Sequence, residues 1–297
     1  MVEKDYWITV VLHNLSKSSF VDRVVFKGGT SLSKVHKITR RFSEDCDLAL
    51  IPGEETANQI KNLITKIEKA IVSTPFEAVK EHPLISKGSK FRKTVHSYPR
   101  LITGESQGIL DVIILEINSF ANPFPYKKMP VSSFISDYIK DYNPTLVDEF
   151  EMGEFTVNVL DLSRTFVEKV LALVRASYQG DSSFNELSNK IRHVYDISRL
   201  MESKEIAEFI KSDDFFKMVD DVRKDDAKNS EFQGDWSKQP LGDSEIFKNT
   251  KTVLAALENT YNDSFKLLLF ESAPEIWSYE VSLALIGKRL KKYDKLK

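Results

Sequence analysis

The spacing of hydrophobic positions changes near residue 160. Before this point, segments with helical spacing alternate with short apolar runs of strand length, whereas only helical spacing follows it. Helices are predicted over residues 3–16, from Thr30 or Ser31 to about Lys37, and over 54–72. The predicted strands cover residues 24–26, 47–51, 76–79, 91–98 and 109–117. The last two strands are expected to pair antiparallel across the Gly104–Gly108 turn.

The remainder of the chain predicts a different architecture. Four prolines make residues 121–160 irregular, with one short strand at 155–160. Helical periodicity then covers residues 163–178, 183–201, 203–222, 244–271 and 274–293, and the acidic pairs within 213–235 indicate a solvated face or loop. We therefore expect an α+β protein. A mixed β-sheet flanked by helices would cover residues 1–160, and a C-terminal α-helical bundle would cover residues 161–297.

Composition excludes several classes of protein. The chain of 297 residues has 41% hydrophobic and 29% charged residues, which argues against wholesale disorder. Its net charge of −2 does not fit a strongly basic nucleic-acid binder, so any polyanion site must be a local patch. A single cysteine, Cys46, excludes an internal disulfide framework and favours a reducing compartment. With no secretory signal and no apolar run near 20 residues, we expect a cytoplasmic protein without a membrane span.

Two consecutive glycines follow the strand that ends at Phe26. Glycines let a backbone approach a phosphate closely, and the following helix offers its N–H groups to the same anion. Serine hydroxyls can add donors, and a lysine can add positive charge. The candidate phosphate ligands in this turn are Lys27, Gly28, Gly29, Thr30, Ser31, Ser33 and Lys34.

Asp45 and Asp47 lie two residues apart at the start of a predicted strand, so both carboxylates face the same side of the sheet. Such a pair of oxygen ligands suits Mg²⁺, which is usually held by few carboxylates together with phosphate and water. A glycine turn alone is usually only a turn, and an Asp-x-Asp pair alone is often a solvated strand start. Together they favour metal-assisted phosphoryl or nucleotidyl transfer. The spacings of a P-loop and of a Rossmann fingerprint are both absent.

The block from Lys27 to Leu48 resembles the AbiEii/AbiGii toxin family of the nucleotidyltransferase superfamily, which has the polymerase-β-like minimal fold. The resemblance extends to the opening Glu3-Lys4-Asp5-Tyr6-Trp7 and to two later motifs, and so covers roughly residues 3–200. It implies Mg²⁺-dependent transfer of a nucleotide from an NTP to a nucleic acid, with tRNA as the expected acceptor. It also implies a toxin of a toxin–antitoxin or phage-exclusion system, with an antitoxin protein as partner.

The two later motifs imply further site residues. The family's lysine on the helix after the β-region corresponds to Lys169 in Glu168-Lys169-Val170-Leu171, where it would neutralise phosphate charge. The family's Arg-Asp-x-x-Asp motif corresponds to Arg192-His193-Val194-Tyr195-Asp196, so histidine replaces the first aspartate. Arg192 would contact the nucleotide, and Asp196 would orient Lys169 or help to activate the acceptor. As i, i+4 neighbours, Arg192 and Asp196 can instead form a surface ion pair.

The superfamily usually adds a third acidic residue from a later strand. Asp111 and Glu116 are the candidates, and alternation places them on opposite faces of that strand. Glu116 resembles the family's strand better. A charge inside an apolar strand is also costly without a partner, which favours a position near the metal for Glu116.

Two alternatives remain open. The same fold can modify a protein or a small molecule, or it can serve as a non-catalytic module that binds nucleotide.

Two local basic groups can bind a polyanion, with Tyr98 and Tyr293 among them for base stacking. One group consists of Lys87, Lys90, Arg92, Lys93 and Arg100, and the other of Lys288, Arg289, Lys291, Lys292, Lys295 and Lys297.

Overall fold

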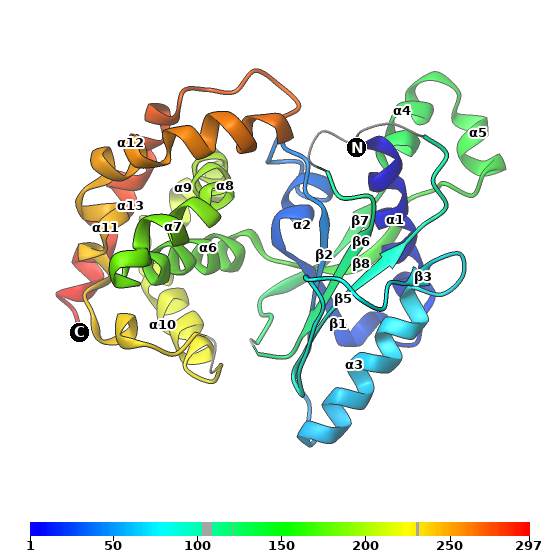
Figure 1. Cartoon of the computed structure of the whole chain (residues 1–297), viewed down its shortest axis with the longest axis horizontal. Helices are drawn as coiled ribbons and strands as arrows, with labels where there is room; N and C mark the ends of the chain where they lie inside the picture. The colour runs from blue at the N-terminus through cyan, green and yellow to red at the C-terminus, as the bar shows by residue number, and fades with distance from the viewer. Residues whose placement is uncertain (103–108, 121, 230–231) are drawn as a thin grey trace. The chain divides into compact units, whose positions relative to one another are not determined.

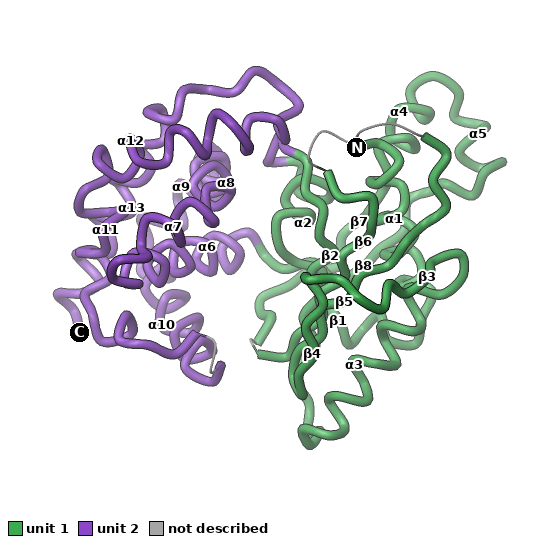
Figure 2. The backbone as a smooth tube through the Cα atoms, viewed as in Figure 1, with its two compact units in different colours: residues 1–37, 42–161 green, residues 38–41, 162–297 purple. Residues whose placement is uncertain are grey.

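The structure is a computed structural model that describes residues 1–102, 109–120, 122–229 and 232–297 (Figure 1). Two compact units make up the chain (Figure 2). Unit 1 contains residues 1–37 and 42–161, and unit 2 contains residues 38–41 and 162–297. The predicted turn at Gly104–Gly108 lies outside the described residues.

Unit 1 is built on one mixed sheet, as predicted. Its strands are β1 (Val24–Lys27), β2 (Asp45–Leu50), β3 (Glu77–Ala78), β4 (Ser86–Lys87), β5 (Phe91–Ser97), β6 (Ile113–Asn118), β7 (Tyr126–Val131) and β8 (Phe155–Leu160). The order is β3-β5-β6-β2-β1-β8-β7, and β4 pairs with β5. β2 and β6 are parallel, as are β1 and β8, whereas β5 and β6 pair antiparallel as expected.

The core of unit 1 lies against one face of this sheet. The helices of unit 1 are α1 (Val2–Lys17), α2 (Gly28–Lys34), α3 (Ala57–Ile71), α4 (Phe134–Tyr142) and α5 (Pro144–Glu149), with a short 3-10 turn η1 (Val21–Arg23). The apolar sides of α1 and α3 pack on alternate strand residues, including Cys46 and Leu48 of β2 and Leu115 of β6. Because side chains alternate along a strand, the residues between them face the opposite side of the sheet.

The stretch 121–160 is more regular than we predicted. It contains β7, α4 and α5 besides the expected strand β8. The prolines are accommodated where a missing N–H costs little. Pro130 lies in β7, an edge strand with a hydrogen-bonded neighbour on one side only, and Pro144 occupies the first turn of α5. Proline therefore marked permissive positions here and did not mark an absence of structure.

Unit 2 is helical, as predicted for the C-terminal part. Its helices are α6 (Leu162–Ser177), α7 (Ser183–Asn189), α8 (Ile191–Met201), α9 (Lys204–Phe209), α10 (Asp214–Asp226), α11 (Glu245–Lys248), α12 (Thr250–Thr260) and α13 (Glu280–Asp294). The short turns are η2 (Gly180–Ser182), η3 (Asp235–Lys238), η4 (Leu241–Asp243), η5 (Tyr261–Phe265), η6 (Lys266–Leu268) and η7 (Ile276–Tyr279). Three of the predicted long helices are thus each divided into shorter ones.

One prediction about unit 2 was wrong. The acidic pair Asp225-Asp226 does not belong to a solvated loop, because both side chains are buried at the end of α10. Asp225 forms an ion pair with Arg164 at 2.6 Å, and Asp226 forms one with Arg175. Both arginines lie on α6, so these acidic residues attach α10 to the central helix of the unit.

Candidate active site

Four ionisable side chains form a row across the sheet of unit 1. In the strand register, Lys27 of β1 pairs with Asp47 of β2, Asp47 with Glu116 of β6, and Glu116 with Lys93 of β5. Residues paired in register face the same side of a sheet, and here that side is opposite the α1 and α3 core. Asp45 lies two residues before Asp47 and so faces the same side. The row is a pair of carboxylates between two lysines, with a third carboxylate beside it.

The electrostatics of this row favour a bound cation. Burial together with repulsion from Glu116 and Asp45 raises the pKa of Asp47 to about 8, although Lys27 and Lys93 act in the opposite direction. The Lys93 ammonium lies 3.8 Å from a Glu116 carboxylate oxygen. Crowded carboxylates that repel one another are the donor set to which a divalent cation binds with a gain of free energy. Asp45 and Asp47, with Glu116 on the neighbouring strand, fit Mg²⁺ by their chemistry.

The carboxylates are not gathered into a finished metal cage. In the described part of the chain, no group of three or more His, Cys, Asp or Glu side chains is placed to hold a metal ion. Mg²⁺ usually needs only one or two protein carboxylates, because phosphate and water oxygens complete its octahedron. The other acidic candidate, Asp111, precedes β6 and forms an ion pair with Arg100 at 2.5 Å, which occupies it outside the row.

Gly28 shapes the turn beside Asp47. Its φ of +80° lies in the left-handed region, and a Cβ atom at this position would stand 2.1 Å from Oδ2 of Asp47. Glycine is therefore required both by the backbone conformation and by the approach of the carboxylate. Lys27, Gly28, Gly29 and Ser33 are half-buried and stay candidate ligands for the triphosphate.

Thr30 and Ser31, which we predicted as phosphate ligands, instead make hydrogen bonds within the fold. α2 begins at Gly28, so Thr30 and Ser31 lie inside the helix and do not cap it, contrary to our prediction. Their hydroxyls are buried and donate to backbone carbonyls, that of Thr30 to Asp45 at 2.5 Å and that of Ser31 to Gly28 at 2.9 Å. Thr30 thus attaches α2 to the start of β2, and neither hydroxyl is free to bind a phosphate.

Lys34 also differs from its predicted role. Its ammonium is buried and lies 2.6 Å from the carboxylate of Asp5, and it donates to the hydroxyl of Thr9 and the carbonyl of Ser132. An ammonium has three donors, and these partners use all of them. Lys34 is therefore a structural cation that attaches α2 to α1, and it does not provide charge to a phosphate in this structure.

A second buried ion pair involves the same part of α1. The Lys4 ammonium lies 2.8 Å from the carboxylate of Glu44 and also donates to the carbonyl of Leu110. Glu44 in turn accepts from the Leu110 N–H at 2.9 Å. Glu44 immediately precedes Asp45, and Leu110 lies before the strand that carries Glu116. The Lys4-Asp5 dipeptide of the family's opening therefore positions the segments that carry the carboxylates, a role that we did not predict.

Unit 2 contains a separate cluster around Asp196 of α8. The Asp196 side chain is fully buried, with Nε and Nη2 of Arg41 at 2.7 and 2.8 Å from its two oxygens and the Lys169 ammonium at 2.9 Å. Burial alone would raise the pKa of Asp196, but Arg41 and Lys169 outweigh it and lower this pKa below its ordinary value. Asp196 thus holds Lys169 by an ion pair, and Arg41 holds Asp196 by a bidentate one.

The alternative prediction, a surface ion pair between Arg192 and Asp196, is wrong. Asp196 is fully buried and pairs with Arg41 and Lys169. Arg192 forms no ion pair among the described residues. His193, which replaces the family's aspartate, has an Nδ1 atom with no hydrogen-bond partner within the described chain. Burial and the neighbouring Lys169 lower the pKa of His193 well below its ordinary value, so the ring is neutral at pH 7. Sequence reasoning missed Arg41, although it stands next to the motif, because its partner lies 155 positions away.

The fold and the carboxylate row behind a glycine turn are those of a nucleotidyltransferase. The family model described as "Nucleotidyl transferase AbiEii toxin, Type IV TA system" matches residues 10–280, and the chain belongs to this family. It is accordingly a nucleotidyltransferase toxin of a type IV toxin–antitoxin system, which implies an NTP substrate and an antitoxin partner. The resemblance seen in the sequence is thereby confirmed.

A solved structure has the same fold. MenT4, a nucleotidyltransferase toxin from Mycobacterium tuberculosis H37Rv, matches with a TM-score of 0.58 and 18% identity over 99% of this chain and 83% of that chain. No curated protein gives a significant match. Within the described residues, no helix is both long and apolar enough to cross a membrane.

Gly28→Ala is expected to lower the rate of nucleotide transfer by about 10²-fold, because the new methyl group must displace the Asp47 carboxylate. Gly180→Ala is the matched control, since Gly180 also has a left-handed φ, of +58°, but has open space around its Cβ position. Both variants should lose about 1–2 kcal/mol of folding free energy from the backbone strain. Steady-state rates and thermal unfolding of the two proteins measure these effects. Equal rates would remove Gly28 from the site.

Proposed function

We propose that this protein transfers the nucleoside monophosphate of an NTP to a nucleic-acid hydroxyl, with tRNA as the acceptor, in a Mg²⁺-dependent reaction. The observation that carries the proposal is the row of Lys27, Asp47, Glu116 and Lys93 on one face of the sheet, with Asp45 beside it. The carboxylates can bind a metal cation, and a lysine lies on each side of them. This arrangement suits a triphosphate, because its negative charge can be neutralised by the metal cation and by the lysines together. The proposed attack is in line at the α-phosphate, and pyrophosphate leaves.

Six site residues of unit 1 have a chemical task in this proposal. Asp45, Asp47 and Glu116 would hold Mg²⁺, which neutralises charge on the phosphate oxygens when it is bound. The turn at Gly28 and Gly29 lets the backbone approach the triphosphate, and Lys27 offers a cation at the same end of the row. These groups are held in place before substrate binds, through the ion pairs of α1, so little reorganisation is needed during the reaction.

The cluster in unit 2 supports binding of an anion. Arg41 and Lys169 provide two positive charges, Asp196 provides one negative charge, and His193 is neutral at pH 7. These four side chains therefore have one positive charge in excess, which an aspartate at position 193 would have cancelled. We propose that Lys169 contributes this charge to the substrate phosphates and that Asp196 positions it. Arg192 remains a proposed nucleotide contact.

The acceptor can be tested directly. The purified protein is incubated with each labelled NTP and Mg²⁺, with a tRNA pool or with a cell-protein pool as acceptor, and the products are identified by mass spectrometry. We expect label on tRNA, none on protein, and no transfer in EDTA. Label on protein or on a small molecule would replace the proposed acceptor, and undiminished transfer in EDTA would remove the Mg²⁺ assignment. Asp45→Asn/Asp47→Asn protein is the control for contaminating activity.

A further inference from the structure

A stripe of lysines follows one side of α13. Lys288, Lys291, Lys292 and Lys295 occupy positions i, i+3, i+4 and i+7 of this helix, and all four are exposed. The opposite side of α13 is buried in unit 2 through Leu283, Ile286, Leu290 and Tyr293. The lysines are thus fixed to a helix that is packed into the fold, and at 1.5 Å per residue the stripe is about 10 Å long.

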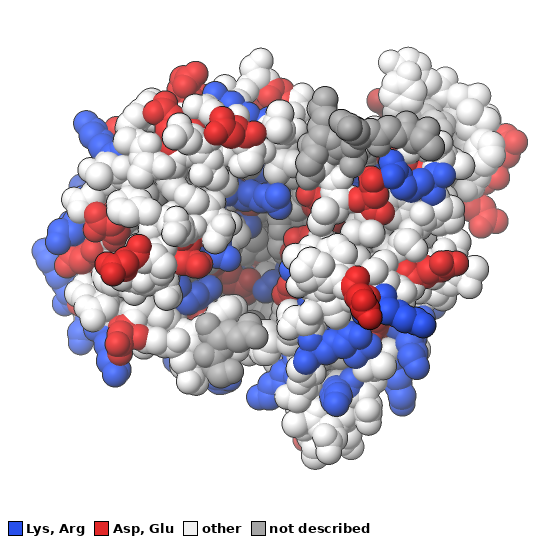
Figure 3. All heavy atoms as spheres, viewed as in Figure 1, with Lys and Arg blue, Asp and Glu red and all other residues white. Residues whose placement is uncertain are grey.

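These lysines line a groove of about 560 Å³, together with Phe247, Ala284 and Gly287. The backbone of Gly287 lies against Phe247, where an added Cβ would stand 3.0 Å from the phenylalanine Cβ. The lining of the groove thus combines four lysines with two small residues and one phenylalanine. Figure 3 shows lysine and arginine side chains along the edge of unit 2 where the C-terminus lies.

The positive charge of this groove is almost uncompensated. Among the described residues, only Lys291 has a carboxylate within 4 Å, that of Asp243 at 3.9 Å. Asp294, the acidic residue nearest in sequence, accepts from the backbone N–H groups of Leu241 and Gly242. Like charges at i, i+4 spacing destabilise a helix, so the stripe costs free energy in the unbound protein.

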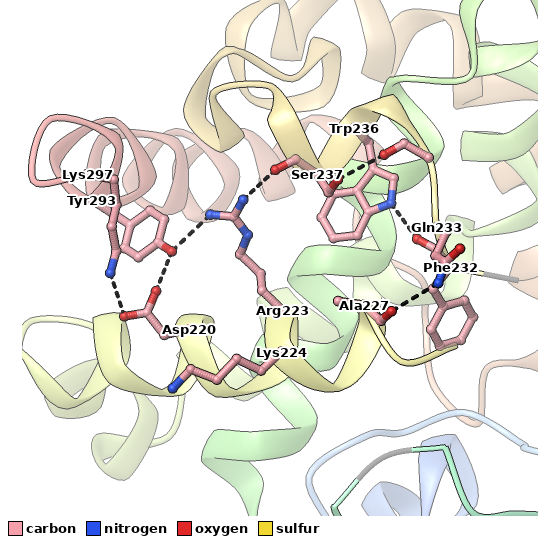
Figure 4. Close-up of a pocket in the computed structure, with 11 residues that line it drawn as sticks. Asp220, Arg223, Lys224, Ala227, Phe232, Gln233, Trp236, Ser237, Tyr293 and Lys297 are labelled. Atoms are coloured by element: carbon pink, nitrogen blue, oxygen red, sulfur yellow. Dashed lines mark hydrogen bonds and ion pairs between the residues drawn. The ribbon is translucent and has the colours of Figure 1, made fainter. Parts of the chain in front are cut away.

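A second hollow in unit 2 is a useful contrast (Figure 4). It has a volume of about 470 Å³ and is lined by Arg223, Lys224 and Lys297 among others. Here each basic group already has a partner in the protein: Lys297 pairs with Asp220 at 2.9 Å, Lys224 with Asp221 at 3.2 Å, and Arg223 donates to Tyr293 and Ser237. The basic groups of this hollow thus all have partners in the protein, whereas in the groove on α13 only Lys291 has a carboxylate within 4 Å among the described residues.

The basic group predicted at the C-terminus therefore divides into two. Arg289 donates to the carbonyl of Ser212 and lies over the Phe216 ring, and Lys297 belongs to the network of Figure 4. We infer that the other four lysines, Lys288, Lys291, Lys292 and Lys295, bind the phosphate backbone of the RNA acceptor. This inference rests on the proposed function and adds a contact surface for its acceptor.

The chemistry of the groove favours RNA over the other polyanions. A membrane-binding helix needs a continuous apolar side to enter the lipid. The main apolar side of α13 is buried in the protein, and its exposed large apolar residues are Val281 and Leu285, which precede the lysines. An acidic protein partner would need apolar surface between its charged contacts. The exposed Val281 and Leu285 of α13 line a different hollow, and the apolar side chains among the lysines in the groove are Ala284 and the buried Phe247. Lysine is a flexible point charge, which suits a backbone of repeated phosphates and reads no base sequence.

The test compares two triple variants that lower the formal net charge equally, by three. Lys288→Gln/Lys292→Gln/Lys295→Gln removes the stripe. Lys204→Gln/Lys211→Gln/Lys238→Gln removes three exposed lysines elsewhere in unit 2. Fluorescence anisotropy with labelled total tRNA gives the dissociation constant between 50 and 200 mM KCl. Each lost phosphate contact lowers the slope of log K against log salt by about 0.7–0.9, so the stripe variant should lose about two to three from this slope.

At 50 mM KCl the stripe variant should bind tRNA at least about tenfold more weakly than wild type, while the control variant binds as wild type does. An unchanged slope in the stripe variant, or equal weakening in both variants, would overturn the inference. The inference would also be overturned if the stripe were needed for binding to phosphatidylserine vesicles but not for binding to tRNA. Because binding is measured without catalysis, a wild type that binds tRNA through the stripe but transfers no nucleotide to it rejects the proposed function alone.

Discussion

Asp47→Asn is expected to abolish nucleotide transfer, by roughly 10³-fold or more, without destabilising the protein. The amide keeps the shape of the carboxylate but cannot replace its charge as a ligand of Mg²⁺. In the metal-free protein, burial and repulsion from Glu116 and Asp45 raise the pKa of Asp47 and so oppose its charged form. The amide avoids this cost, so the melting temperature should stay equal or rise. Asp45→Asn is expected to have the same effect on transfer.

Thermal unfolding with and without Mg²⁺ separates these effects. A ligand that binds only the folded protein raises its melting temperature, so Mg²⁺ should stabilise wild type and leave Asp47→Asn unchanged. Asp111→Asn is the matched control, because Asp111 has an ion pair with Arg100 outside the row. It should transfer nucleotide as wild type does. Normal transfer by Asp47→Asn would show that the row does not hold the catalytic cation.

Lys169→Met is expected to lower the turnover number by about 10²–10³-fold, the usual loss when one donor to a developing anion is removed. Methionine keeps much of the apolar stem of lysine and removes the ammonium. Asp196 keeps its bidentate partner Arg41, so the loss of stability should be smaller than the 3–5 kcal/mol that a wholly unpaired buried charge costs.

The control for Lys169→Met is Arg164→Met in the same helix. Arg164 is also a buried cation in ion pairs, with Asp225 at 2.6 Å and Glu168 at 3.1 Å, but it does not contact Asp196. Turnover is compared per folded molecule, with the folded fraction taken from thermal unfolding. If both variants lose turnover equally, the effect of Lys169 is structural. The positive charge that neutralises the phosphates must then come from another residue.

Local patterns in the sequence predicted those features of the structure that depend on residues close together in the chain. Asp45 and Asp47 share a face because alternation along one strand decides it, and β5 pairs with β6 because the two segments adjoin in sequence. The mixed sheet and the C-terminal helices followed from the same change in periodicity that the sequence displays. The prolines misled us because their effect depends on the position of the strand or helix turn in the fold, as with Pro130 in an edge strand.

Ion pairs between residues far apart in the chain could not be predicted from the spacing of residues in the sequence. The partner of Asp5 is 29 positions away, that of Lys4 is 40, and that of Arg41 is 155. Nothing in the local pattern distinguishes Lys34, which is buried and structural, from Lys27, which lies in the row across the sheet. A lysine beside a glycine turn suits a phosphate equally well in either case, and only the packing of α1 decides between the two roles.

The Arg41–Asp196 ion pair also sets an order of events during synthesis. Arg41 belongs to the short segment 38–41 of unit 2, while the residues on either side of it belong to unit 1. A ribosome adds about 5–20 residues per second, so Arg41 precedes Asp196 by roughly 10–30 seconds. During that interval the nascent chain lacks the aspartate that holds Lys169. A toxin with this connectivity cannot complete its lysine cluster before α8 has been made, and a chain broken off earlier is released without it.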